Sequence, residues 1–407
     1  MSKQRFEVQR HLDQVYVARQ NGDVPRPRPG EVLLEMVACG ICGADIRVVT
    51  KNKTASGDAA SYITLGHEGI GRVVALGDAP ELQPGDYAVV LPHVHRSENM
   101  PPCFAPRITP VCIGSGHTLH MGWDIDGCFA DFMVVPTTNV VRVARRHLRL
   151  AARQAPRLRE AIFALVEPML CTLSAYELLK MHLQNDLPPG RALVIGCGPI
   201  GILHGLALLE RGFEVWLMDT VQKRAELAQW CLDHRGHVFD PVKHSGAFDL
   251  SMVTASSAAA IRTGEALVRK GGIVYLFAGL NTADRAAMDQ ENIFYYEPVH
   301  RRAQDIRTTL RLAHKDKSIL YLGHSGYFEH LVPQAIAAVA ANAASLDRAV
   351  TGIIPGLASS RIVSRLPGGV DWTTGDGSPA IVSILNGTDL RERHCKLIVL
   401  PNNEHYS

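Results

Sequence analysis

Two side chains that bind metal ions follow glycine-marked turns in the N-terminal part of the chain. Cys42 lies in the run Gly40-Ile41-Cys42-Gly43-Ala44-Asp45, and His67 lies in Gly66-His67-Glu68. Cysteine sulfur and histidine nitrogen are preferred ligands of Zn²⁺, and a site with three protein ligands keeps a fourth position free for water or substrate. We therefore expect an open zinc site whose third ligand is either Glu68 or Glu167.

A second run has the spacing of a dinucleotide-binding turn, Val194-Ile195-Gly196-Cys197-Gly198-Pro199-Ile200-Gly201. The first glycine makes the bend, the second lets the backbone approach a pyrophosphate, and the third allows close packing of helix on strand. The pyrophosphate then lies at the helix N-terminus, where free amides and the helix dipole favour an anion. The expected cofactor-binding residues are Gly196, Gly198, Pro199, Ile200, Gly201, Asp219 and Arg224.

Asp219 indicates which dinucleotide binds. It ends the next expected strand, where a carboxylate accepts hydrogen bonds from the adenosine ribose hydroxyls and repels a 2′-phosphate. This favours NAD over NADP. Arg224 leaves an alternative open, because a cation five residues further on could pair with Asp219, stack on adenine or bind a phosphate.

The hydrophobic pattern of the segments that must position these residues changes near Arg145. Residues 30–145 contain short apolar runs broken by Gly, Pro and Asp, which predict a compact all-β unit, perhaps a closed barrel. A helix is predicted over 159–182, and then strands and helices alternate. The expected elements are strands at 191–195, 214–218, 248–253 and 273–277 and helices at 199–211, 222–234 and 258–269. This alternation predicts an α/β unit with a parallel sheet covered on both faces.

The C-terminal part returns to short strands, notably 396–400, after an Ala-rich helix predicted over 328–344. We infer that it rejoins the first domain, which makes the α/β unit an insertion. The expected domains are residues 1–160, 161–318 and 319–407, the last completing the first. At 407 residues the chain exceeds what one hydrophobic core usually supports, in line with two domains.

Composition excludes several classes of protein. A 46% apolar and 20% charged composition is that of a soluble globular protein, and a net charge of +2 favours neither nucleic acid nor an anionic membrane. The N-terminus lacks a signal-peptide core, and no uninterrupted apolar stretch approaches membrane-spanning length, so we expect a cytoplasmic protein. Nine scattered cysteines indicate metal-binding, catalytic or buried thiols rather than a disulfide framework.

Taken together, these segments resemble the zinc-dependent medium-chain dehydrogenases, the alcohol and polyol dehydrogenase family. The resemblance covers most of the chain. Besides the two runs above, it rests on Gly66-His67-Glu68-Gly69-Ile70-Gly71 with Gly77, Gly85-Asp86, Cys128-Phe129-Ala130-Asp131-Phe132 before Val135-Pro136, and Glu167-Pro168. It implies a GroES-like, barrel-shaped catalytic domain built from both chain ends, a Rossmann domain between them, and an assembly of two or four copies.

Residue by residue, the resemblance makes Cys42 and His67 zinc ligands. Glu68 matches a residue that in polyol-type members binds the metal or stands just behind it. Glu167 falls where members place the remaining protein ligand or a carboxylate bonded to the zinc-bound water. Asp45 matches the acid that orients the ring of the histidine ligand. The implied catalytic residues are Cys42, Asp45, His67, Glu68 and Glu167.

The chain departs from the family at the proton relay. Members usually carry Ser or Thr two residues after the first ligand and often His three further on, but here these positions are Ala44 and Arg47. Neither serves as a neutral hydroxyl or imidazole relay. Either the proton leaves through Glu68, Glu167 or a nearby histidine, or ordinary alcohol oxidation has been lost.

A second departure concerns the four-cysteine lobe that binds structural zinc in many members. Only Cys103 and Cys112 remain in the corresponding loop, without the close pair spacing. We therefore expect one catalytic zinc and no structural zinc. A substitute site formed by His93, His95, Cys103 and Cys112 is the alternative.

The expected function is hydride transfer between a secondary alcohol and NAD, with a polyol, cyclitol or amino alcohol as substrate. Two alternatives stay open. One is a redox-neutral epimerase or lyase that recycles a tightly held NAD, and the other is a non-catalytic zinc and nucleotide binding protein. The basic stretch from His300 to Lys317 is interpreted as a solvated helix face rather than an anion-binding surface.

Overall fold

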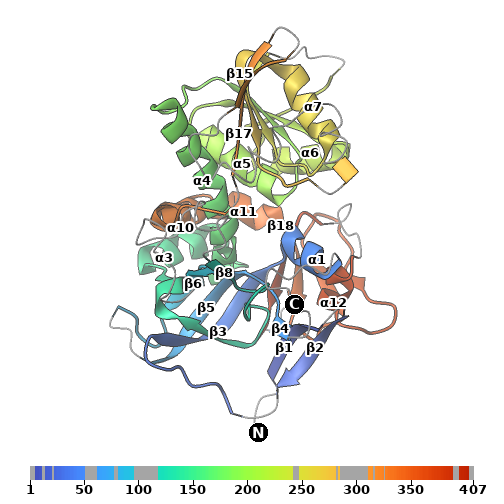
Figure 1. The fold of residues 1–407 in the computed structure, drawn as a ribbon. Coiled ribbons are helices and arrows are strands. Elements are labelled where there is room, and N and C mark those ends of the chain that lie inside the picture. The colour runs from blue at the N-terminus through green and yellow to red at the C-terminus, as the bar shows by residue number, and fades with distance from the viewer. Residues whose placement is uncertain are drawn as a thin grey trace. The chain divides into compact units, whose positions relative to one another are not determined.

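The computed structural model divides the chain into two compact units, which are described separately (Figure 1). It describes residues 5–11, 14–20, 23–50, 62–77, 81–95, 118–241, 247–280, 283–284, 310–314, 317–324, 326–387 and 394–402. The described part of the first unit ends at Glu167 and resumes at Val332, and residues 168–331 belong to the second. The α/β unit is therefore inserted into the first one, as the sequence predicted.

The first unit contains a nine-stranded, mainly antiparallel sheet with the order β10-β6-β5-β3-β21-β18-β19-β20, and β9 also pairs with β3. Its strands are β3 (Glu31–Gly40), β5 (Glu68–Leu76), β6 (Tyr87–Val90), β9 (Phe132–Pro136), β10 (Val140–Arg142), β18 (Val350–Pro355), β19 (Arg361–Ser364), β20 (Trp372–Thr373) and β21 (Lys396–Leu400). Residues Cys39 and Gly40 of β3 pair with β21, so strands from both ends of the chain share one sheet.

Smaller elements complete this unit. A three-stranded sheet is formed by β1 (Arg5–His11), β2 (Gln14–Gln20) and β4 (Ile63–Thr64). A separate antiparallel pair is formed by β7 (His93–His95) and β8 (Thr118–His120). The helical elements are α1 (Gly43–Thr50), η1 (Thr137–Asn139), α3 (Arg145–Gln154), η2 (Arg159–Leu165), α10 (Val332–Ala341), α11 (Ala343–Ala349) and α12 (Ala380–Leu385). Fully buried side chains such as Leu34, Met36 and Phe129 form its core.

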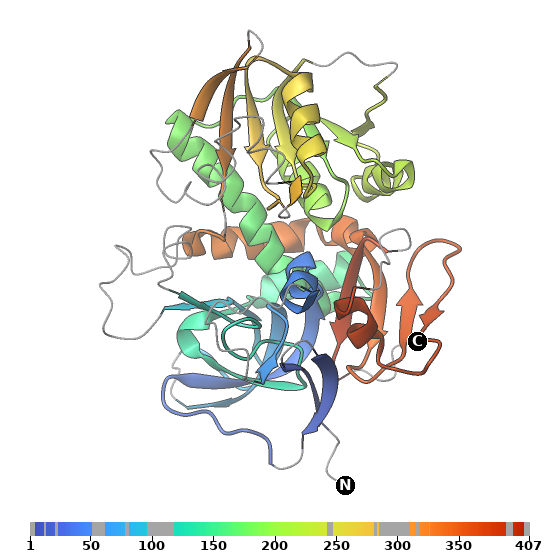
Figure 2. The same ribbon diagram turned by 45° about the vertical axis from the view of Figure 1, so that its right-hand side comes forward.

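The second unit is built on a seven-stranded sheet with the order β13-β12-β11-β14-β15-β17-β16 (Figure 2). All neighbouring pairs are parallel except β16 with β17. The elements are β11 (Arg191–Ile195), α5 (Pro199–Glu210), β12 (Glu214–Met218), α6 (Gln222–Cys231), β13 (His237–Val238), β14 (Phe248–Val253), α7 (Ala258–Leu267), β15 (Val268–Leu276), β16 (Leu310–His314), β17 (Lys317–Gly323) and η3 (Glu329–Leu331). The predicted parallel α/β sheet is confirmed.

Four details differ from the sequence predictions. The boundary expected after residue 318 would cut β17, which pairs with β15 and so belongs to the second sheet. The described part of the basic stretch, β16, is a strand and not a helix. The helix predicted over 159–182 is the 3₁₀ segment η2 followed by α4 (Val166–Leu183). The helix predicted over 328–344 consists of η3, α10 and α11, with a break at Asn342.

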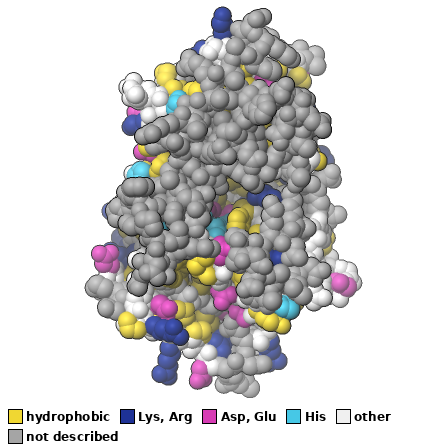
Figure 3. All heavy atoms as spheres, in the orientation of Figure 1, with side chains coloured by type: hydrophobic (Ala, Val, Ile, Leu, Met, Phe, Trp, Pro, Cys, Tyr) yellow, Lys and Arg dark blue, Asp and Glu magenta, His cyan; other side chains and the backbone are white. Residues whose placement is uncertain are grey.

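Among the residues that the structure describes, length and composition alone would let one helical segment, Arg159–Leu183, cross a membrane. Charged residues such as Glu167 and Glu177 interrupt this segment, so it is not the uninterrupted apolar stretch that the sequence lacks. The structure buries 83% of its most apolar window inside the protein, so it is a core helix. On the described part of the face in Figure 3, acidic and basic side chains are interspersed, in line with a net charge of +2.

Candidate active site

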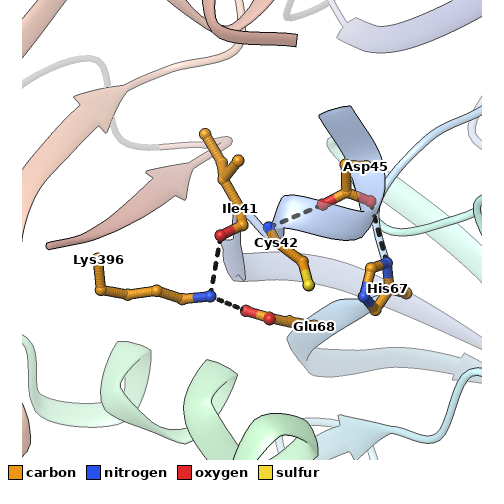
Figure 4. A network of polar contacts seen from close by, with 6 residues as sticks. All are labelled: Ile41, Cys42, Asp45, His67, Glu68 and Lys396. Carbon is orange, nitrogen blue, oxygen red and sulfur yellow. Dashed lines mark hydrogen bonds and ion pairs between the residues drawn. The ribbon is translucent and has the colours of Figure 1, made fainter. Parts of the chain in front are cut away.

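Three side chains that could bind a metal ion converge in the first unit (Figure 4). Cys42 follows β3, His67 precedes β5, and Glu68 is the first residue of β5. The antiparallel pairing of β3 with β5 places Gly40 opposite Glu68, which brings the two segments side by side. The ligand atoms of Cys42, His67 and Glu68 all lie within 4.8 Å of one another. One thiolate, one imidazole and one carboxylate form a donor set that suits zinc and leaves a fourth position free.

Glu167, the alternative third ligand, is not a member of this convergent group. It is half-buried at the start of α4 and ends the first unit. Of the two carboxylates that the sequence proposed, the structure therefore brings Glu68 to the Cys42 and His67 donors.

Asp45 fixes the orientation of His67. Its Oδ1 lies 3.0 Å from His67 Nδ1, and its Oδ2 accepts a hydrogen bond of 2.9 Å from the backbone N–H of Cys42. Burial disfavours the charged imidazole, but the charge of Asp45 and its hydrogen bond outweigh this and raise the pKa of His67 well above its ordinary value. A proton held at Nδ1 leaves Nε2 as the nitrogen that can bind a metal.

Lys396 is a member of this network that the sequence analysis missed. Its Nζ donates a hydrogen bond of 2.9 Å to the carbonyl of Ile41 and forms an ion pair with Glu68 Oε2 (Figure 4). Both side chains are almost fully buried. Burial lowers the pKa of Lys396, but the negative groups around it, Glu68 first, raise it overall. The signal in the sequence was a lysine at the start of the apolar strand Lys396–Leu400.

An aromatic cluster adjoins His67 in the same unit. His120 lies edge-on to His67, with ring centroids 5.1 Å apart, and stacks on Trp123 at 4.2 Å. His93 pairs with His120 across β7 and β8 and contacts its ring. Burial, with the nearby His67, lowers the pKa of His93 to about 3. Burial also lowers the pKa of His120 well below its ordinary value, so both rings are neutral near pH 7.

The structure describes both residues at the proton-relay positions and part of the alternative structural zinc site. Ala44 is buried and Arg47 is exposed on α1, so neither position supplies a hydroxyl or imidazole. Of the substitute structural zinc site, Cys103 and Cys112 lie outside the described residues, and only His93 and His95 can be placed, both on β7.

The dinucleotide-binding turn has the geometry that the glycine spacing predicts. Gly196 joins β11 to α5 with φ +102°, a conformation that favours glycine. A Cβ on Gly201 would collide with the carbonyl oxygen of Gly196, so this residue must be glycine for α5 to pack against the turn. A Cβ on Gly198 would meet nothing within 4 Å. Open space here, with Pro199 beginning α5, matches the close approach of a pyrophosphate.

Asp219 follows β12 and is anchored by backbone donors. The N–H of Cys197 donates to its Oδ2 at 2.8 Å, and the N–H of Val221 donates to its Oδ1 at 2.9 Å. Arg224 Nη1 lies 3.8 Å from Oδ2, so the ion pair with Asp219, one of the three roles considered for Arg224, is formed in the structure. The carboxylate is thus joined to the glycine turn and held at the end of the strand.

Comparisons with known proteins agree with this architecture. Residues 28–145 match the model of the alcohol dehydrogenase GroES-like domain. The chain is 27% identical over 257 residues to glucose 1-dehydrogenase of Thermoproteus tenax, covering 62% of this chain and 69% of that protein. It is 29% identical over 210 residues to L-threonine 3-dehydrogenase of Pyrococcus abyssi, covering 51% of this chain and 54% of that protein.

A solved structure extends the likeness over both units. Glucose dehydrogenase of Haloferax mediterranei in complex with NADP, Zn and gluconolactone superimposes with a TM-score of 0.66, covering 97% of this chain and 99% of that one. The two sequences are 16% identical, so this likeness concerns the fold.

Proposed function

We propose that this chain, which belongs to the zinc-dependent medium-chain dehydrogenase family, transfers a hydride between a secondary alcohol and NAD. It is an enzyme of the alcohol dehydrogenase type that uses zinc and a nicotinamide dinucleotide. The proposal extends this to a polar alcohol (a polyol, cyclitol or amino alcohol) and to NAD. The observation that carries it is the convergence of Cys42, His67 and Glu68.

The three donors would hold zinc, which supplies a Lewis acid that makes an alcohol proton removable near neutral pH. The residues around them prepare this site. Asp45 keeps a proton on His67 Nδ1 and turns Nε2 to the ligand position, while its second oxygen holds the backbone of Cys42. Lys396 balances the charge of Glu68 inside the protein. The sulfur of Cys42, the imidazole of His67 and the carboxylate of Glu68 are thereby positioned before a metal binds.

NAD supplies the hydride acceptor, and the second unit provides its binding turn. Gly198 leaves room for the pyrophosphate, and Asp219 offers the lone pairs that its two backbone donors do not use to ribose hydroxyls. The charge of Asp219 opposes a 2′-phosphate, and this supports NAD over NADP. Arg224 is positively charged and would attract a 2′-phosphate, but it is paired with Asp219, so it weakens the repulsion of the 2′-phosphate without reversing it.

The proposal is tested by Cys42→Ser in the purified, zinc-loaded protein. Loss of the thiolate should remove most of the bound zinc and abolish NADH formation with a panel of polyols, cyclitols and amino alcohols, while NAD binding persists. Cys171→Ser, in α4, is the matched control and should keep both zinc and turnover. Full zinc content and unchanged turnover in Cys42→Ser would refute the assignment.

One observation favours a second reaction class, the redox-neutral epimerase or lyase. Ala44 and Arg47 leave the usual proton relay without a hydroxyl or imidazole. The two reactions differ in their products, because alcohol oxidation releases one NADH per turnover and a redox-neutral reaction releases none. Assembly as a homodimer or homotetramer and a cytoplasmic location are further proposals.

A further inference from the structure

We propose that the exposed side of α3 is a docking surface for the phosphate backbone of double-stranded nucleic acid, bound without regard to base sequence. Four arginines of this helix form the surface, which we call the arginine face: Arg145, Arg146, Arg149 and Arg153. The arginine face shares no residue with the metal site or the dinucleotide-binding turn, and docking there needs no catalysis.

Positive charge is concentrated in one stretch of the sequence. Between Asp131 and Glu160 the chain carries seven arginines and no lysine, aspartate or glutamate. All seven arginines are exposed. The net charge of +2, which argued against nucleic acid as a partner, is an average over the whole chain and hides this stretch. A local field of one sign attracts polyanions even when the whole chain is almost neutral.

The helix aligns four of these charges on one side. At 3.6 residues per turn, the side chains of the arginine face fall within about 100° of arc. On the opposite side, Ala151 and Ala155 are fully buried where α3 packs on η2, α10 and α11 of the same unit (Figure 1). Arginines four residues apart are separated by about 6 Å along the helix axis. The surface is therefore a row of cations, which suits a linear polyanion better than one small anion.

No carboxylate neutralises this row. Within the described part of the chain, Arg159 pairs with Glu160, whereas the arginine face and its neighbours Arg142 and Arg157 form no ion pair. The helix also begins without a side-chain cap or an acidic residue in its first turn, so its first two arginines oppose the helix dipole. Like charges four residues apart repel one another as well. The pattern thus weakens the isolated helix, and a bound polyanion relieves both effects.

The types of side chain favour the phosphates of a duplex. A guanidinium is a planar fork that binds a phosphate through two hydrogen bonds, which lysine cannot do. Residues 142–159 include no Phe, Trp or Tyr on which unpaired bases could stack, so a single strand fits poorly. None of the exposed large apolar side chains of the described residues lies on α3, so nothing there inserts into lipid. Carboxylates of an acidic protein can use the same fork, and the experiment separates the two.

The test is a titration of a fluorescently labelled DNA duplex of about 20 base pairs with the full-length protein, followed by anisotropy at about 50 to 200 mM NaCl. Four phosphate contacts predict a slope of about −3.6 in a plot of the logarithm of the association constant against that of the salt concentration. The affinity should therefore fall about a hundredfold over this range. A duplex of unrelated sequence should bind equally well.

The triple variant Arg145→Gln, Arg149→Gln and Arg153→Gln removes three of the four charges. Glutamine forms helices nearly as well as arginine, so α3 should stay folded, which circular dichroism checks. The magnitude of the slope should fall by about 2.7, because each lost phosphate contact removes about 0.9. The same three positions changed to lysine keep the charge but lose the fork. That variant should retain the slope and bind severalfold more weakly.

The matched control is the triple variant Arg19→Gln, Arg26→Gln and Arg28→Gln. It removes three exposed arginines of the same unit that lie outside α3, so the net charge changes by the same amount. Its slope should equal that of the wild type. An equal change of slope in both glutamine triple variants, or no binding of duplex at about 50 mM salt, overturns the proposal.

Two further probes test other partners. They are vesicles of phosphatidylserine and phosphatidylcholine, and poly-glutamate. If either binds more tightly than the duplex and loses binding in the glutamine triple variant of the arginine face, the partner is an anionic membrane or an acidic protein, and the proposal is overturned. None of these measurements uses turnover, so failure of the proposed hydride transfer leaves their outcome unchanged.

Discussion

Lys396 Nζ forms an ion pair with Glu68 Oε2 inside the first unit, although the two residues lie 328 positions apart in the sequence. Lys396 begins β21 and Glu68 begins β5, and both strands belong to the same sheet as β3, which Cys42 follows by two residues. The last strand that the structure describes therefore supplies the counter-charge of a carboxylate in the proposed metal site. The ion pair makes the metal centre depend on the return of the C-terminal segment to the first unit.

Lys396→Met should destabilise the metal-free protein by about 3–5 kcal/mol, because it leaves the Glu68 carboxylate buried without its cation. Chemical denaturation in the presence of a chelator measures this loss. The double variant Lys396→Met with Glu68→Gln should recover most of it, since neither charge remains. Arg269→Met, which breaks the half-exposed pair with Asp249, is the control and should cost about 1 kcal/mol or less. An equally small loss in Lys396→Met would contradict the role assigned to the pair.

The sequence predicted most of the second unit closely because its signals are local. The strands at 191–195, 214–218 and 248–253 match β11, β12 and β14, since each is a short apolar run bounded by turn residues. The glycine turn was likewise readable from spacing alone. The predicted C-terminal boundary of this unit was wrong, because β17 belongs to the unit through its pairing with β15, which the composition of β17 does not reveal.

The metal centre was predictable only in part, because its members come from distant segments. Cys42, His67 and Asp45 stand in runs whose residue types suggest ligands, and the structure joins Asp45 to His67. The choice between Glu68 and Glu167 needed the register of β3 with β5. Lys396 could not be assigned from its own strand, since a charge in an apolar run shows only that a partner is needed.

Asp45→Asn should weaken zinc binding about 10- to 100-fold, because the neutral amide no longer supports the basicity and tautomer of His67. Competition with a chromogenic chelator at constant pH gives the dissociation constant. Asp131→Asn is the control, since Asp131 is also buried in this unit but binds the backbone N–H of Phe6. Equal zinc affinity in wild type and Asp45→Asn would contradict the orienting role of this carboxylate.

Asp219→Asn should shift cofactor preference toward NADP. The variant removes the charge that repels a 2′-phosphate and frees Arg224, which lies 3.8 Å away, to bind that phosphate. We expect the ratio of NAD to NADP dissociation constants to change by about tenfold or more, which is about 1.4 kcal/mol. Titration of protein fluorescence with each cofactor measures it. Asp219→Asn with Arg224→Ala should lose affinity for NADP again; a double variant that keeps it would show that Arg224 takes no part.

His93 should make the first unit sensitive to acid. Its pKa in the folded protein is about 3, because burial and the nearby His67 oppose its charge, whereas its ordinary value is 6.5. The unfolded chain therefore binds a proton that the folded chain excludes, so stability is complete above pH 6.5 and falls as the pH drops toward 3. Between pH 7 and pH 5 this histidine should cost about 2 kcal/mol, from 1.36 kcal/mol per pH unit.

The measurement is the free energy of unfolding of metal-free wild type and His93→Phe at these two pH values, so that release of zinc in acid does not contribute. The wild type should lose about 2 kcal/mol more than His93→Phe over this interval. Leu91→Ala removes buried apolar volume two residues away without removing a titrating group, so it should lower stability equally at both pH values. If wild type and His93→Phe lose stability in parallel, the proton taken up on unfolding comes from another group, and His120, whose pKa burial also lowers, is the next residue to replace.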